Sequence, residues 1–321
     1  MKTRLIPLAL ACLLAAAPTT AQVNYFNYGG IAVVGSSPNA SGDIVIASTF
    51  SGYPVGIILN SAFSGCTNLR SVTIPNSVTS IQSPVFSGCT SLTNLSVDAA
   101  NSTFSSLDGV VFNKAQTTLI IFPPGRGNYV IPNGVTSIGG QAFYNCTRLT
   151  NVIIGNSVTN IGSGAFSACS NLTRLTIPAS VINLGYAAFY GSSRLTNFTF
   201  LGNAPRRIFD MDGGFAQFAS VGAGAKAYYY CGTTGWGANY GELPTVMLCP
   251  PQIAPGSAGV KPGGFGFTLT FLTNQTIVVE ASTNLVNWQP IWTNPPPGAS
   301  ADFADPDWLQ QPRRFYRARS D

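Results

Sequence analysis

The sequence contains no histidine and little charge of either sign. Only 8% of its 321 residues are charged, whereas ordinary soluble domains reach about 25%. Without an imidazole, the usual Ser/His/Asp and Cys/His catalytic arrangements and the HExxH zinc site are excluded. Eleven carboxylates are left for acid–base chemistry. The composition therefore favours a non-enzymatic protein with no catalytic residues, no metal and no cofactor.

Beyond its first residues the chain also lacks a long apolar run. Residues 1–21 have the pattern of a secretory signal peptide, in which Lys2 and Arg4 precede the apolar residues 5–17. No later stretch reaches the ~18 uninterrupted apolar residues of a membrane span. We therefore predict an exported protein, secreted or at the cell surface, with no transmembrane segment after signal cleavage.

The net charge does not indicate nucleic-acid binding. Removal of Lys2 and Arg4 with the signal peptide takes two positive charges from the formal net charge of +5 and leaves +3. Nucleic-acid-binding domains concentrate a larger positive charge on one face. We expect no nucleic-acid partner.

A 23-residue repeat dominates the middle of the sequence. Its markers are a phenylalanine and, three residues later, a cysteine, which Ser192 replaces in the last copy. The marker residues are Phe63, Phe86, Phe143, Phe166 and Phe189, with Cys66, Cys89, Cys146 and Cys169. Phe86 and Phe143 are 57 residues apart, which allows one ordinary repeat plus 34 residues or one enlarged repeat. A fixed period of this size predicts a solenoid.

Each repeat combines two periodicities. Ala165, Cys169 and Leu172 follow the i, i+4, i+7 pattern of a short helical segment. Leu175 and Ile177 then alternate with polar residues, as in a short strand. In stacked coils the phenylalanines would form an inner ladder, and truncating one to alanine would cost about 3–5 kcal/mol. The cysteines are expected to be small, buried apolar side chains.

Over residues 50–200 this pattern resembles the BspA-type bacterial leucine-rich repeats. The resemblance implies a curved stack of coils with a parallel sheet on one face, typically non-catalytic and often adhesive or at the cell surface. It supplies no catalytic residues to transfer to this chain. Residues 98–134 fit a variant unit of that family, and we interpret them as a hairpin-like excursion that rejoins the coil at Val135.

The whole chain is expected to form a leucine-rich-repeat solenoid, with short parallel strands and short helical turns, followed by a small all-β domain. The expected parts are a signal peptide (1–21), an N-terminal cap (22–50), the solenoid (51–205), a C-terminal cap (206–250), a linker (251–264) and a β-module (265–321). Cys231 and Cys249 lie outside the repeat. Because export permits disulfides, we expect these two to be bonded, with two free thiols as the alternative.

The candidate binding residues occupy outward positions of the predicted strands, between the buried pairs. They are Asn94, Asn151, Arg174 and Asn197, together with Arg148 and Arg194, which flank Asn171 at the rim. This polar row could hold a glycan or an extended peptide, or it is simply solvated strand surface. We predict a monomeric adhesion or binding protein whose partner is an extracellular protein or glycan.

Two other functions stay open. A secreted carbohydrate-active enzyme needs two facing carboxylates, and between residues 54 and 200 only Asp98 and Asp108 are available. Asp108 is more simply the first residue of an Asp-Gly turn. Alternatively, residues 265–321 are a surface-retention or sugar-binding module. The working residues of that module would be Trp288, Trp292 and Trp308.

Overall fold

The computed structural model describes residues 23–208, 217–249, 251–271, 276–294, 298, 300–310 and 313–320, so the predicted signal peptide lies outside the described residues. The chain divides into two compact units. The first is Met1–Ala227 with Thr234–Thr245, and the second is Tyr228–Thr233 with Val246–Asp321. Within the described residues, no helix has the length and apolar character needed to span a membrane.

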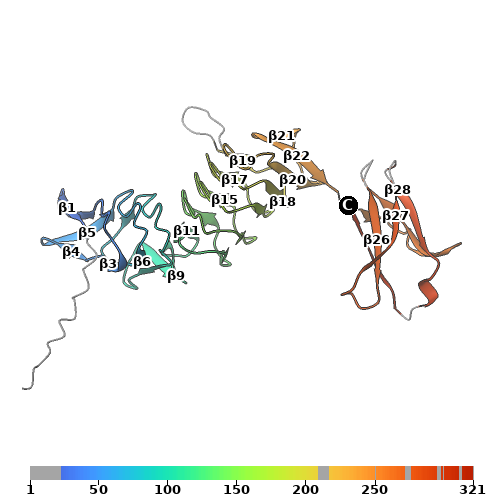
Figure 1. Ribbon diagram of the computed structural model, residues 1–321, viewed down its shortest axis with the longest axis horizontal. Helices are drawn as coiled ribbons and strands as arrows, with labels where there is room; N and C mark the ends of the chain where they lie inside the picture. The colour runs from blue at the N-terminus through green and yellow to red at the C-terminus, as the bar shows by residue number, and fades with distance from the viewer. Residues whose placement is uncertain are drawn as a thin grey trace, which may run out of the picture. The chain divides into compact units, whose positions relative to one another are not determined.

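The first unit is a coil in which each turn contributes one strand to a front row (Figure 1). These front strands are β3 (Gly42–Val45), β6 (Leu69–Ile74), β8 (Asn94–Val97), β12 (Tyr129–Val130), β14 (Val152–Ile153), β16 (Arg174–Ile177) and β18 (Asn197–Phe200). The strands pair in parallel within three groups, β3–β6–β8, β12–β14 and β16–β18, with Val72 opposite Leu95 and Leu175 opposite Phe198. Along β16, exposed and buried residues alternate, as the period-two pattern predicts.

A back row of shorter strands closes each coil. Its members are β7 (Ser80–Ile81), β11 (Thr118–Ile121), β13 (Ser137–Ile138), β15 (Asn160–Ile161), β17 (Asn183–Leu184) and β19 (Arg206–Arg207). From β13 onward these strands pair in parallel, and residues 23 apart lie opposite one another. Figure 1 shows β15, β17 and β19 stacked side by side. The repeat period is therefore the register of the coil.

The prediction of short helices within the repeats is wrong, because turns occupy those positions. An α-helical N–H bonds to the carbonyl four residues back. Here the N–H groups of Phe143 and Phe166 donate instead to the carbonyls of Ala165 and Ala188 in the next coil, at 2.8 and 2.7 Å. Ala168 has a φ of 58°, which an α-helix does not permit. Stacking of the coils thus replaces the local helical bonds.

The repeat phenylalanines stack along the inside of the coil. Ring centroids are 5.4 Å apart for Phe63 and Phe86, 4.8 Å for Phe143 and Phe166, and 5.9 Å for Phe166 and Phe189. Two further rings, which the repeat pattern does not mark, also belong to the ladder. Phe122 lies 4.8 Å from Phe143, and Phe218 lies 5.5 Å from Phe189.

The repeat cysteines are buried, and their thiols donate hydrogen bonds to carbonyls of the preceding coil. The well-formed bonds run from Cys66 to Ser37 at 3.2 Å, from Cys89 to Phe63 at 2.9 Å and from Cys169 to Phe143 at 3.1 Å. Ser192 does the same, since its hydroxyl donates to the Phe166 carbonyl at 2.7 Å. This position therefore suits a small donor, which corrects our description of it as apolar and explains why serine is accepted, although the Cys146 thiol lies 3.9 Å from the Phe122 carbonyl.

The enlarged segment between Phe86 and Phe143 forms two coils. The first runs 36 residues to Phe122 and the second only 21. The first carries the predicted hairpin, made of β9 (Phe104–Leu107) and β10 (Val110–Asn113) in antiparallel pairing. The hairpin prediction is confirmed, but the chain rejoins the coil at β11, well before Val135, because Thr118 already pairs with Ser137.

Other elements complete the first unit at its two ends. Near the N-terminus, β1 (Tyr25–Tyr28), β2 (Ile31–Val34), β4 (Thr49–Phe50) and β5 (Tyr53–Ile58) form a sheet that also includes β7. Toward the other end lies β21 (Asn239–Tyr240), together with residues of β20 (Lys226–Tyr230) and β22 (Leu243–Leu248), two strands that continue into the second unit. There Tyr240 packs edge-on against Phe218 and Phe200, so aromatic rings cover the end of the phenylalanine ladder.

The second unit contains two antiparallel sheets around an aromatic and aliphatic core. One sheet has β23 (Gln252–Ile253), β24 (Gly259–Lys261), β25 (Gly264–Thr270) and β28 (Ser300–Asp305), and the other has β26 (Ile277–Ser282), β27 (Gln289–Asn294) and β29 (Phe315–Ser320). The described residues contain a single helical element, the 3-10 helix Trp308–Gln310. The segment 251–264, expected to be a linker, supplies β23 and β24, which pair with β25.

The phenylalanine ladder predicts a large loss of stability from a single truncation. Phe166 is fully buried between two stacked rings, so Phe166→Ala should lower the free energy of unfolding by about 3–5 kcal/mol. The control is Tyr190→Ala, because Tyr190 is 52% exposed. Urea denaturation of the full chain followed by circular dichroism measures both. Equal effects of the two substitutions would contradict the ladder as the source of stability.

The donor role of the cysteine position predicts how Ser192 can be replaced. Ser192→Ala would leave the buried Phe166 carbonyl and Cys169 N–H without their partner, at a cost of about 1–3 kcal/mol. Ser192→Cys should retain most of the stability, because the thiol donates as in the other repeats. Thermal unfolding compares the variants. If Ser192→Ala is as stable as the parent, the hydrogen bond is unimportant.

Candidate functional site

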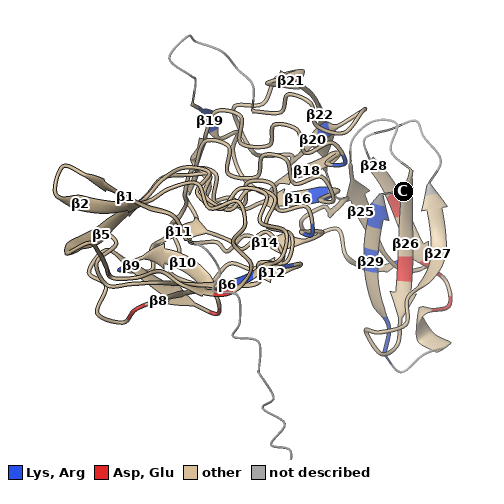
Figure 2. Cartoon of the chain, turned by 60° about the vertical axis from the view of Figure 1, so that its left-hand side comes forward, with Lys and Arg blue, Asp and Glu red and all other residues tan. Residues whose placement is uncertain are grey.

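The outward side chains of the front strands, which we call the front surface, are mainly amides and hydroxyls. Arginines and the exposed apolar side chains of Val45, Val130 and Ile153 interrupt them. Thr73 and Ser96 are hydrogen-bonded across neighbouring coils at 2.9 Å. Arg174 lies opposite Asn197, and Asn94 lies opposite Ser71. Figure 2 shows how few charged residues lie along the coils. The predicted binding positions are thus placed on one row of strands.

The hairpin interrupts this row between β8 and β12. The N–H of Leu95 donates to the Gly109 carbonyl at 3.0 Å, so the hairpin turn occupies the free edge of β8. Gly109 lies so close to Asn94 that a β-carbon there would be 2.7 Å from the Asn94 Oδ1. Asn94 is therefore separated from Asn151, and the six predicted residues do not form one continuous site.

Asn151 and Arg174 share a pocket of about 310 Å³, which we call the Asn151 pocket. The β12–β14 pair and the sheet that contains β16 and β18 are separate, and the pocket lies between them. Its lining combines these polar side chains with two apolar ones that are unusually accessible, Ile153 at 52% and Leu201 at 43% exposure. The structure thus joins two predicted residues and adds an apolar floor.

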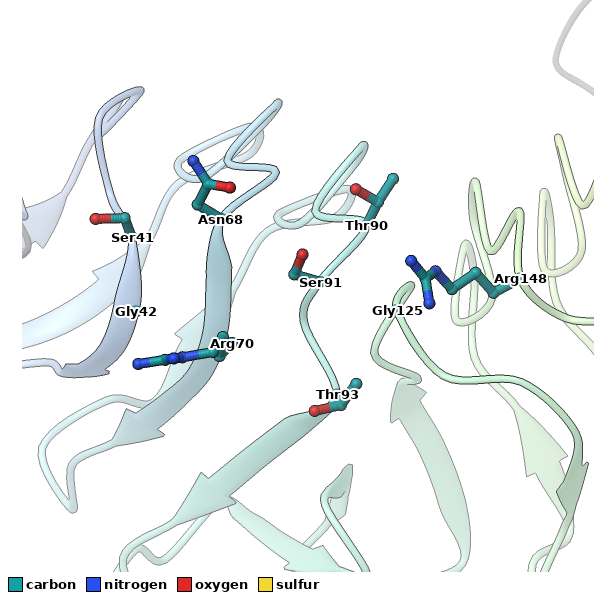
Figure 3. A pocket seen from close by; sticks show the side chains of 9 residues that line it. All are labelled: Ser41, Gly42, Asn68, Arg70, Thr90, Ser91, Thr93, Gly125 and Arg148. Carbon is teal, nitrogen blue, oxygen red and sulfur yellow. The ribbon is translucent and has the colours of Figure 1, made fainter.

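A second and larger hollow, of about 660 Å³, contains Arg148 (Figure 3). We call it the Arg70–Arg148 hollow. It is lined by Ser41, Gly42, Asn68, Arg70, Thr90, Ser91, Thr93, Gly125 and Arg148. Figure 3 shows Arg70 at one side and Arg148 at the other, with Ser91 and Thr93 between them. Of these residues, sequence analysis had selected Arg148 alone.

The hollow lies where one coil is two residues short. Seven residues lead from Phe122 to Tyr129, which pairs with Val152, whereas nine lead from Phe143 to Val152. The shortened loop packs tightly through Gly125, whose N–H donates to the Leu92 carbonyl at 2.8 Å. A β-carbon on Gly125 would come within 2.6 Å of that carbonyl oxygen. The two residues missing from this coil are the sequence feature that could have indicated the hollow.

The remaining predicted residue, Arg194, lies outside the linings of both hollows. Its guanidinium donates to the Asn171 Oδ1 at 2.9 Å, and the Asn171 amide donates to the Thr147 carbonyl at 2.6 Å. The sequence-based placement of Arg194 beside Asn171 is therefore correct. The pair links three successive coils along the rim.

The two carboxylates of the enzyme alternative have structural tasks. Asp98 accepts a hydrogen bond from the N–H of Ala100 at 2.8 Å, which forms a local turn after β8. Asp108 has a φ of 48° and Gly109 one of 73°, as in the tight turns of two-residue hairpins. The turn lies beside Leu95 at the start of β8, whereas Asp98 follows its end. Neither carboxylate lines the Asn151 pocket described above.

The three tryptophans of the second unit have different environments. Trp292 packs against the core and lies 5.9 Å from Phe303, and Trp308 lies 6.0 Å from Phe265. Trp288 is covered by the Arg317 guanidinium at 4.3 Å. They therefore do not form a shared aromatic platform of the kind that sugar binding by stacking would use.

Trp288 borders an ion-pair cluster on β26 and β29. Figure 2 shows acidic β26 beside basic β29. Glu280 is buried and pairs with Arg317 at 2.6 Å and Arg319 at 3.2 Å. The hydrogen bond from Arg317 lowers the pKa of Glu280 below its ordinary value. The Arg317 side chain is therefore engaged by both Trp288 and Glu280.

Cys231 and Cys249 are both free thiols in the structure, so the expected disulfide is not formed there. The two side chains are nevertheless neighbours, since they are hydrogen-bonded to each other. Burial, followed by this hydrogen bond, raises the pKa of Cys249 to about 11. Cys231 is exposed. The disulfide stays a prediction for an oxidising environment.

The repeating coil can be compared with known protein families. The family model described as BspA type leucine rich repeat region matches six copies, over residues 48–128 and 126–209. The chain belongs to this family. Proteins with BspA-type repeats are typically found at the cell surface, often in adhesion, and generally bind other molecules rather than catalyse reactions. No curated protein matches the chain.

Three solved structures similar to this BspA-type chain come from bacteria. The pneumococcal vaccine antigen PcpA is 23% identical, with 58% of this chain and 50% of that chain covered and a TM-score of 0.46. A leucine-rich repeat protein of Eubacterium ventriosum is 18% identical, with coverages of 61% and 62% and a TM-score of 0.47. A leucine-rich cell surface protein of Faecalibacterium prausnitzii is 22% identical, with coverages of 57% and 55% and a TM-score of 0.41. The match thus spans only 50–62% of those chains.

The neighbouring thiols predict a specific oxidation product. After exposure of the full chain to oxidised glutathione, Cys231 and Cys249 should be linked, and the protein should be lighter by two hydrogen atoms. Closing this loop would add about 3 kcal/mol to the stability. Peptide mass spectrometry under non-reducing conditions identifies the link. The repeat thiols serve as the internal control, since burial raises the pKa of Cys89 and Cys169 to about 12. A link between repeat cysteines would contradict this assignment.

Proposed function

We propose that this chain is an exported, monomeric, non-enzymatic adhesion protein, and that its front surface binds an extracellular protein or glycan. The observation that carries the proposal is the Asn151 pocket. It combines an amide, a guanidinium and two exposed apolar side chains in one hollow. Binding sites commonly pair an apolar floor with a few polar groups that orient the ligand.

The position of the pocket supports its accessibility to a large partner. Asn151, which immediately precedes β14, and Ile153 within it are exposed, as are Arg174 and Thr176 on β16. Asn197 lies next to Arg174 on β18, so the polar surface continues beyond the pocket. A ligand bound here would contact several neighbouring coils simultaneously. Arg194 and Asn94 lie farther along the same surface.

Both alternatives have weaker support. Asp98 and Asp108 are engaged in separate turns, whereas glycoside hydrolysis needs two carboxylates on either side of one bond. Trp292 is packed into the core of the second unit. Trp288 and Trp308 remain partly exposed. The experiment must therefore distinguish binding by the front surface from retention at the cell surface through the second unit.

The pocket predicts that two isoleucines with similar exposure differ in importance. The full chain is applied to an array of glycans and matrix proteins, and the affinity for the strongest ligand is then measured. Ile153→Ser combined with Arg174→Gln should weaken binding by about tenfold or more, because it removes apolar contact and a charged donor. The matched control is Ile182→Ser combined with Arg206→Gln, because Ile182 is 55% exposed but precedes back strand β17, and Arg206 is an exposed arginine of back strand β19.

Three outcomes would overturn the proposal. One is equal loss of affinity in the control and the test variant. Another is loss of binding in Trp288→Ala with no change in the Ile153 variant, which would transfer binding to the second unit. The third is cleavage of a glycan that disappears in the Asp98→Asn, Asp108→Asn double variant, which would identify an enzyme.

A further inference from the structure

We propose that the Arg70–Arg148 hollow binds a segment of an acidic polysaccharide. This inference deepens the proposed function and rests on it, since it names the ligand class of a second site on the same unit. The hollow measures about 660 Å³, within the ~300–1,000 Å³ range of ligand pockets. Its lining residues supply both the charge and the hydrogen-bonding groups that such a ligand needs.

The charge of the lining is positive. Arg70 and Arg148 contribute two guanidinium groups, and none of the nine lining residues is acidic. The nearest carboxylate partner, Asp43, pairs with Arg70 at 3.3 Å, and both side chains are largely exposed. Among the described residues, Arg148 has no ion pair or side-chain hydrogen bond. A guanidinium binds carboxylates and sulfates through parallel hydrogen bonds, so Arg148 is the principal anchor.

The separation of the two arginines favours an extended ligand over a single small anion. Arg70 belongs to the β6 coil and Arg148 to the β14 coil, with the β8 and β12 coils between them. Three strand spacings of ~4.8 Å place their backbones at least about 14 Å apart. Arg70 also reaches away from Arg148, over Gly42 toward Asp43 (Figure 3). One carboxylate cannot contact both guanidinium groups.

The rest of the lining matches hydroxylated sugar units. Its side chains are the hydroxyls of Ser41, Thr90, Ser91 and Thr93 and the amide of Asn68. Each can donate to and accept from a sugar hydroxyl. No aliphatic or aromatic side chain lines the hollow, in contrast to the Asn151 pocket. Peptide-binding grooves rely on apolar pockets or on an open sheet edge, so an acidic sugar fits this lining better than an acidic peptide.

The experiment uses the full chain and four defined probes in titration calorimetry. Tetragalacturonate carries carboxylates, and a chondroitin sulfate tetrasaccharide carries both carboxylates and sulfates. Fully methyl-esterified tetragalacturonate is the neutral match of the first probe, and tetraglutamate represents an acidic peptide. We expect at least one acidic sugar to bind, with affinity that falls as salt is raised. The neutral ester should bind at least tenfold more weakly.

The variant that tests the anchor is Arg148→Gln, which removes a charge without breaking any contact described within the fold. It should weaken binding of the acidic sugar by about tenfold or more. Arg206→Gln is the control, because Arg206 is an exposed arginine of back strand β19 and its loss changes the net charge equally. Binding in this control should stay within about twofold of the parent.

Several outcomes would overturn the inference. They are failure of both acidic sugars to bind, equal binding of the neutral ester, or an equal effect of Arg148→Gln and Arg206→Gln. Arg148-dependent binding of tetraglutamate in preference to both sugars would instead assign the hollow to a peptide. None of these outcomes decides the proposed function, because that depends on Ile153 and Arg174 in the Asn151 pocket. If the Ile153 variant still loses its array ligand, only the acidic-sugar assignment fails.

Discussion

Hydrogen bonding from one coil to the next is the constraint on which the rest of the first unit depends. The N–H of Phe143 reaches the carbonyl of Ala165, and the N–H of Phe166 reaches Ala188. Because each bond joins residues about one repeat apart, equivalent residues of successive repeats lie above one another. The buried phenylalanines therefore form one ladder, and the small hydrogen-bond donors form another. A local helix would use the same N–H groups within its own coil. The two arrangements exclude each other, and the stacked one prevails.

This competition explains what could and could not be predicted from the sequence. The repeat period, the front strands and the stacked phenylalanines follow from spacing alone, because identical residues recur at 23-residue intervals. The helices were wrongly predicted, since the apolar i, i+4, i+7 pattern reports which side chains face inward but not where the backbone bonds go. Phe122 and Phe218 were missed because their flanking residues differ from the repeat motif, although both rings occupy the same ladder.

The candidate sites were less predictable than the fold because they arise where the repeat is broken. The hairpin separates Asn94 from Asn151, and the coil after it is two residues short. A pattern of outward residues treats all coils as equivalent, so it selected Arg148 by its rim position and overlooked Arg70. The buried amide of Asn101 anchors the hairpin segment, with its donors on the Pro75 and Val78 carbonyls and its oxygen on the Thr103 and Phe104 N–H groups. The irregular coil is thus held in place by buried hydrogen bonds.

The scarcity of charge gives the few arginines of the front side an importance that they would lack in an ordinary protein. On a surface rich in lysine and glutamate, neighbouring charges of opposite sign would weaken the field of a single guanidinium. Here Asp43 is the one carboxylate among the described residues that pairs with Arg70, and the hydroxyls around Arg148 do not neutralise it. A charged ligand would therefore be oriented by the two guanidinium groups, while the hydroxyls and the amide of the lining bind its uncharged parts. Such a surface gains selectivity for the charge of a ligand without the broad attraction that a strongly basic protein exerts on every polyanion.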